Sequence, residues 1–169
     1  CIRYRLREDI LALVAALLDA RGALLDEAAT SQTTVMPGYT HMQPAQPTTV
    51  AHWLCSHEAA LARDTRRLLD AYDRVNRSPL GAAAFAGTTF EVDRERTAAL
   101  LGFDGLVENA MDAVSTRDFL FETVAAVSGV AVTLSGLATD GITYASRGYL
   151  ELDDDYASTS SIMPQKKNP

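Results

Sequence analysis

An uncharged helical stretch in the last third of this sequence limits the folds that the chain can adopt. No charged residue occurs between Glu122 and Asp140, and residues 119 to about 146 follow a helical pattern. A helix that is apolar on all sides must be covered on all sides. The uncharged run is short for a membrane span and contains five hydroxyl side chains, so we expect no membrane insertion. The pattern instead predicts burial at the centre of an oligomeric helix bundle, where Gly129 and Gly136 let a neighbouring helix approach closely.

Two further long helices precede this one. Apolar residues between residue 3 and about residue 30 alternate steps of four and three, the spacing of a bundle seam. Pro47 is suited to open the second long helix, because the first turn of a helix tolerates its missing N–H. A short helix follows, with Asp93 as its N-cap and Gly102 as its stop. We therefore predict an all-α fold, a long-helix bundle in which residues 1–169 form part of one central helical bundle domain.

Composition excludes several classes of protein. A net charge of −7 argues against nucleic acid as a partner. No metal-ligand or glycine-rich phosphate motif occurs, so we expect no metal and no cofactor. His52 and His57 lie five residues apart, whereas a metal site on a helix uses a spacing of four, so we interpret both histidines as structural. Trp53 is expected to anchor the packing. No signal-peptide pattern opens the sequence, and we expect a cytoplasmic protein. Because the sequence starts inside a helical pattern, we expect an internal piece of a longer chain.

Residues 36–47 interrupt the helical periodicity. Three of the six prolines and one glycine fall here, and they predict a fixed, irregular turn. His41 lies inside this proline-braced segment. General acid/base chemistry needs a positioned group that titrates near neutrality, so His41 is a candidate catalytic residue, although a structural role is as well supported by the residues alone.

The second candidate segment is the end of the chain, residues 157–169. Lys166 and Lys167 are the only lysines of the sequence, and they follow two serines and a run of backbone amides. Such a loop is suited to bind an anion, because oriented N–H groups and an ammonium converge on one oxyanion.

Both segments resemble one known family. Gly38-Tyr39-Thr40-His41-Met42-Gln43-Pro44-Ala45-Gln46-Pro47 and Ser160-Ser161-Ile162-Met163-Pro164-Gln165-Lys166-Lys167-Asn168-Pro169 are similar to two signatures of the argininosuccinate lyases, a branch of the fumarase/aspartase superfamily. The stretch from Pro79 to Phe90 is similar to the same proteins. One position differs: Thr159 stands where the family usually has glycine. Threonine restricts the backbone more than glycine does.

The resemblance implies a β-elimination that splits argininosuccinate into arginine and fumarate, without a cofactor. It also implies a homotetramer whose active sites are shared between subunits. Whether Ser160 or His41 acts as the base stays open. The family's Arg-Asn loop and the glutamate partner of the histidine would lie outside this sequence. The catalytic residues that the resemblance implies are His41, Ser160 and Lys166, and the substrate-binding residues are Thr40, Gln43, Ser161 and Asn168.

Three other interpretations remain at this point. The chain could belong to a fumarase, aspartase or adenylosuccinate lyase of the same superfamily. It could instead be a non-catalytic structural homologue of the crystallin type. A generic helical assembly domain with an incidental lysine pair is the third.

Overall fold

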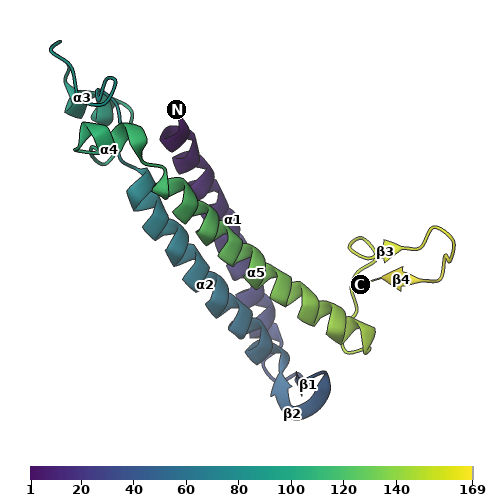
Figure 1. Cartoon of the computed structure of the whole chain (residues 1–169). Coiled ribbons are helices and arrows are strands. Elements are labelled where there is room, and N and C mark those ends of the chain that lie inside the picture. The colour runs from purple at the N-terminus through teal and green to yellow at the C-terminus, as the bar shows by residue number, and fades with distance from the viewer. Residues whose placement is uncertain (169) are drawn as a thin grey trace. The chain divides into compact units, whose positions relative to one another are not determined.

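The computed structural model describes residues 1–168, and these residues are mainly helical (Figure 1). The predicted all-α class with three long helices is confirmed. By contact density the chain divides into two compact units, one made of residues 1–23 with 61–129 and the other of residues 24–60 with those from 130 onward. The elements in chain order are α1 (Ile2–Thr30), β1 (Val35–Thr40), β2 (Gln43–Thr49), α2 (Val50–Val75), α3 (Arg94–Leu100), α4 (Ala110–Ser115), α5 (Asp118–Ser146), β3 (Ser158–Thr159) and β4 (Lys167–Asn168).

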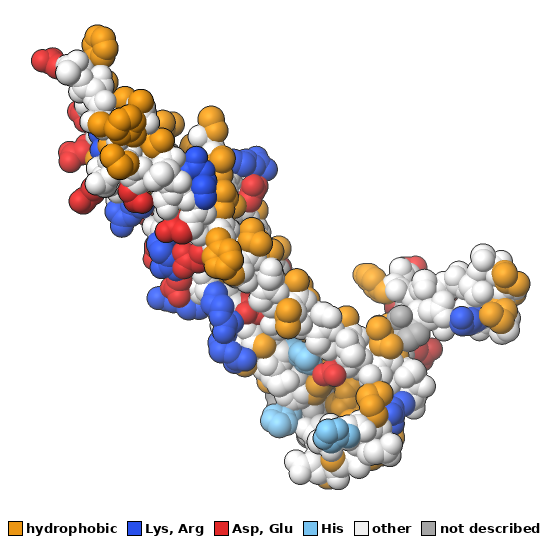
Figure 2. Space-filling view, in the orientation of Figure 1, with side chains coloured by type: hydrophobic (Ala, Val, Ile, Leu, Met, Phe, Trp, Pro, Cys, Tyr) orange, Lys and Arg blue, Asp and Glu red, His pale blue; other side chains and the backbone are white. Residues whose placement is uncertain are grey.

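Helix α5 buries one face and leaves the others open on this chain. Phe121, Val124 and Val132 are 79%, 64% and 73% exposed, and Figure 2 shows hydrophobic side chains at the surface along this helix. By length and composition alone α5 could cross a membrane, a property that it shares with core helices of soluble proteins. The buried positions are separated by bundle-type spacings: Phe119, Thr123, Ala126, Val130 and Tyr144.

Two arginines at the start of α1 stabilise the ends of other helices in the first unit. Cations in a first turn oppose the dipole of their own helix. Arg3, however, is 7% exposed, and its Nη1 donates to the carbonyl oxygen of Arg74 (2.7 Å) in the last turn of α2. Arg7 Nη2 donates to the carbonyl oxygen of Leu101 (2.8 Å), directly after α3. Carbonyls at a helix end have no partner within the helix, so each arginine satisfies groups that would otherwise lack one.

The connection between α2 and α5 contains one predicted helix and one unexpected helix. Helix α3 begins after Asp93, whose carboxylate accepts from the backbone N–H of Arg96 (2.8 Å), as the sequence predicted. Gly102 follows the helix at φ 70°, a conformation that favours glycine. The six-residue helix α4 was not predicted, and Asn109 caps it by accepting from two backbone N–H groups.

The prediction for residues 36–47 was wrong in form. They belong to an antiparallel hairpin of β1 and β2, in which Pro37 lies opposite Pro47. Pro47 therefore belongs to a strand and does not open α2, which begins at Val50. Proline is excluded from central strands because it lacks the N–H donor, but both strands of a two-stranded hairpin are edge strands. The prolines are thus compatible with a hairpin.

Candidate functional site

The hairpin presents His41 at its tip. Thr40 pairs with Gln43, so the connection consists of His41 and Met42 alone. Both have positive φ, 48° and 64°, as a type I′ turn requires. Non-glycine residues in this conformation cost about 1–2 kcal/mol each and persist where the surroundings hold them. His41 is exposed.

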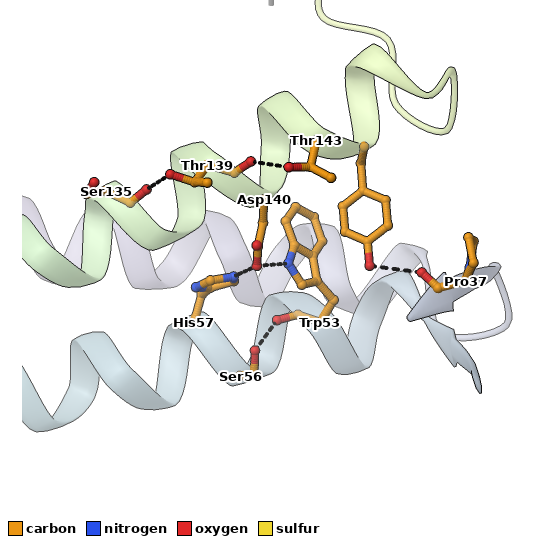
Figure 3. Close-up of polar contacts among 9 residues, drawn as sticks. Pro37, Trp53, Ser56, His57, Ser135, Thr139, Asp140 and Thr143 are labelled. Atoms are coloured by element: carbon orange, nitrogen blue, oxygen red, sulfur yellow. Dashed lines mark hydrogen bonds and ion pairs between the residues drawn. The ribbon is translucent and has the colours of Figure 1, made fainter. Parts of the chain in front are cut away.

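A polar and aromatic cluster anchors the base of the hairpin in the second unit (Figure 3). Asp140 Oδ2 on α5 accepts from Trp53 Nε1 and from His57 Nε2, each at 3.1 Å. The Trp53 ring packs edge-on against Tyr144, with centroids 5.4 Å apart. The Tyr144 hydroxyl donates to the carbonyl oxygen of Pro37 (3.0 Å), and burial together with Asp140 raises the pKa of Tyr144. The cluster thus connects α2, α5 and β1, and it gives His57 and Trp53 the structural roles that the sequence predicted.

A pocket of about 500 Å³ lies beside this cluster. Its lining combines a carboxylate, an imidazole, hydroxyls and aromatic rings, so a polar ligand finds both donors and acceptors there. Thr40, a predicted substrate-binding residue, lies on its wall. Within residues 1–168 no group of histidine, cysteine and acidic side chains has the arrangement of a metal site. The main lining residues are Tyr39, Thr40, Gln46, His52, Trp53, Asp140 and Tyr144.

The second candidate segment is closed by the short pairing of β3 with β4, in which Ser158 lies opposite Asn168. Inside it, Ser160 Oγ accepts from the backbone N–H groups of Ile162 (3.3 Å) and Met163 (3.2 Å). Two N–H donors on one hydroxyl oxygen favour negative charge on that oxygen. This is the environment that a serine needs before it can act as a base.

The two lysines of this loop differ in their contacts. Lys167 forms an ion pair with Asp154, and the pKa of Lys167 is raised mainly by its hydrogen bond to that carboxylate. No such pair is recorded for Lys166 among the described residues, and its backbone N–H donates to the carbonyl oxygen of Met163 (3.0 Å). Pro169, the last residue of the predicted loop, lies outside the described residues.

The structure gathers the predicted site residues into two groups. Thr40, His41 and Gln43 share the hairpin tip. Ser160, Ser161, Lys166 and Asn168 share the terminal loop. Across residues 1–168, no hydrogen bond or ion pair is recorded between the hairpin and this loop.

Sequence reasoning missed Asp140 and Tyr144 as residues that hold the hairpin. A signal for Asp140 was present, because it is the first charge after the uncharged run of α5. Its donors, Trp53 and His57, lie four residues apart and therefore on the same face of α2.

Comparison with known proteins agrees with the two motifs. The family described as "Lyase" matches residues 1–169. Argininosuccinate lyases of Natronomonas pharaonis, Haloarcula marismortui and Methanosarcina barkeri are 72%, 69% and 57% identical over all of this chain. The chain spans about a third of the length of these curated relatives, 34%, 34% and 35% respectively.

Solved structures show the same fold. The crystal structure of EDDS lyase in complex with formate aligns with 99% of this chain and 34% of its own, at a TM-score of 0.96 and 42% identity. The class II fumarase from Schistosoma mansoni aligns with 98% of this chain and 41% of its own, at a TM-score of 0.83 and 18% identity, which bears on the fold alone. With its whole length matched by the family and by relatives of high identity, the chain belongs to the lyase family.

Proposed function

We propose that the full-length protein is a cytoplasmic argininosuccinate lyase that splits argininosuccinate into arginine and fumarate by β-elimination. The observation that carries the chemistry is the position of Ser160 Oγ under two backbone N–H groups, in the loop that also contains Lys166. The choice of substrate follows from the names of the relatives that are 54–72% identical. Residues 1–169 are then part of the central helical bundle domain, with the histidine loop at 36–47 and the signature loop at 157–169.

The reaction removes a weakly acidic proton beside a carboxylate, and the product of that step carries two negative charges on one group. Such a transition state needs fixed cations and N–H donors where the charge develops. In the proposed site, Ser160 takes part in the proton transfer with Lys166 and the loop amides near the developing charge. His41 donates a proton to the leaving nitrogen. The residues that bind the substrate are Thr40, Gln43, Ser161 and Asn168. The proposed division of base and acid is Ser160 as base and His41 as acid.

The site is proposed to form between subunits of a homotetramer. Two observations support this. No hydrogen bond or ion pair joins the hairpin to the terminal loop along residues 1–168, and α5 exposes large apolar side chains such as Phe121 and Val132. Burying those side chains against other copies would stabilise the assembly and could bring the loops of different copies together.

The test uses purified full-length protein and argininosuccinate, with fumarate release followed by ultraviolet absorbance. We expect turnover by the parent and a loss of at least about 100-fold in kcat for His41→Asn and for Ser160→Ala. Ser115→Ala is the matched serine control and keeps parental kcat, because Ser115 is exposed on α4 and its hydroxyl donates to the carbonyl oxygen of Met111 in the same helix. Parental turnover by His41→Asn or Ser160→Ala would refute the assigned roles.

A second candidate is a related carbon–nitrogen lyase with another substrate. It is favoured by the 42% identity and the TM-score of 0.96 with EDDS lyase. Turnover of EDDS but not of argininosuccinate by the full-length protein would establish this alternative.

A further inference from the structure

The ring of Tyr39, two residues before His41, is held by residues at and beyond the end of α5. The Tyr144 ring packs edge-on against it, with centroids 5.8 Å apart. The Arg147 guanidinium lies over its face, with Cζ 4.3 Å from the centroid. A side-chain hydrogen bond to Tyr39 is the main cause of the raised pKa of Tyr149. We call Tyr39 with Tyr144, Arg147 and Tyr149 the tyrosine clasp.

Arg147 also reaches the turn itself. Its Nη2 donates to the carbonyl oxygen of Met42 (2.9 Å), the residue that follows His41. Met42 and His41 are the two residues held at positive φ. A hydrogen bond and a cation–π contact from one planar guanidinium therefore act on both sides of the imidazole-bearing residue.

We propose that Arg147 is a positioning residue, which holds the strained hairpin tip through Tyr39 and Met42 and so fixes the orientation of His41. This inference rests on the proposed function, in which His41 takes part in proton transfer. General acid/base catalysis depends on a donor–acceptor geometry that small displacements destroy. Arg147 is exposed, so its removal opens no cavity in the core. Its loss should move the tip while the rest of the fold stays stable.

The experiment compares four variants of the full-length protein with the parent: Arg147→Met, Arg147→Lys, Arg147→Met with Met42→Gly, and Arg96→Met. For Arg147→Met we expect kcat about tenfold lower at saturating substrate, since a misplaced general acid loses part of its contribution. Glycine adopts positive φ without strain. Met42→Gly in the same chain should therefore restore kcat to within about threefold of the parent.

Two variants separate positioning from a general effect on the protein. Lysine keeps a cation and a donor but lacks the planar group, so Arg147→Lys should lose less kcat than Arg147→Met. Arg96→Met is the matched control, because Arg96 is an exposed arginine on α3 and its removal should leave kcat unchanged.

Hydrogen–deuterium exchange of the peptide spanning residues 35–49 gives a readout that needs no turnover. We expect faster exchange there in Arg147→Met and parental exchange when Met42→Gly is added. If the parent does not cleave argininosuccinate, the proposed function fails, and this exchange measurement still decides whether Arg147 holds the tip. The inference is overturned if Arg147→Met leaves kcat and hairpin exchange unchanged, or if Met42→Gly relieves neither change.

Discussion

Replacing Arg3 with methionine would remove one of the most buried charges of the first unit while keeping an unbranched apolar stem. The guanidinium donates to the carbonyl oxygens of Arg74 (2.7 Å) and Val75 (3.4 Å) and lies 3.7 Å from the centroid of the Phe119 ring. The substitution therefore leaves the last turn of α2 without its cap and α5 without a cationic contact.

The magnitude follows from these contacts. A buried carbonyl that loses its partner costs about 1–3 kcal/mol, and a desolvated cation–π contact contributes about 2 kcal/mol. Part of this is offset because burying the guanidinium is itself unfavourable, as the lowered pKa of Arg3 indicates, with burial as the main cause. We expect a net loss of about 2–3 kcal/mol in the local free energy of opening at the end of α2.

Native-state hydrogen exchange of the amides at residues 72–76 in the full-length protein measures this quantity. A loss of that size makes exchange there about 30- to 150-fold faster. The matched control is Arg5→Met on the same helix, because the Arg5 side chain is 74% exposed and pairs with nearby carboxylates of α1. Exposed pairs of this kind contribute about 0.5 kcal/mol or less. Equal effects of the two substitutions, or a change below about 0.5 kcal/mol for Arg3→Met, would refute the capping role.

Three further predictions follow from the site. Mixing equal amounts of the inactive His41→Asn and Ser160→Ala proteins under conditions that exchange subunits should recover about a quarter of parental activity. In a site shared between two subunits, random assembly supplies an intact His41 in half of the cases and an intact Ser160 in half of those. No recovery would indicate that each site is built within one subunit. Trp53→Phe should lower the free energy of unfolding by about 1–2 kcal/mol, because it removes a hydrogen bond to the half-exposed carboxylate of Asp140; an unchanged melting temperature would contradict this. The ion pair with Asp154 raises the pKa of Lys167 above the ordinary 10.5. The contribution of this pair to loop stability is therefore complete below pH 10.5 and disappears as pH rises through the folded pKa. Above the folded pKa, the loop should exchange amide protons no faster in Lys167→Ala than in the parent, because the parent has lost the ion pair as well.

Local patterns were sufficient to predict most of the secondary structure. The spacing of apolar residues predicted α1 and α5 to within two residues, because a helix depends on contacts between residues three and four apart. The hairpin was not predicted, since its prolines disfavour most sheets and its pairing depends on residues up to 14 positions apart, such as Val35 with Thr49. Helix α4 was too short to produce a periodic signal.

The sequence by itself determined the helical class and, through the two motifs, which side chains are candidates for chemistry. Only the tertiary structure placed His41 on a strained two-residue turn, brought Arg147 to the carbonyl oxygen of Met42, and joined Trp53 to Asp140, 87 residues away. The physical reason is that helix formation responds to neighbours along the chain. The partners of a buried or strained polar group, in contrast, come from whichever distant segments packing brings beside it.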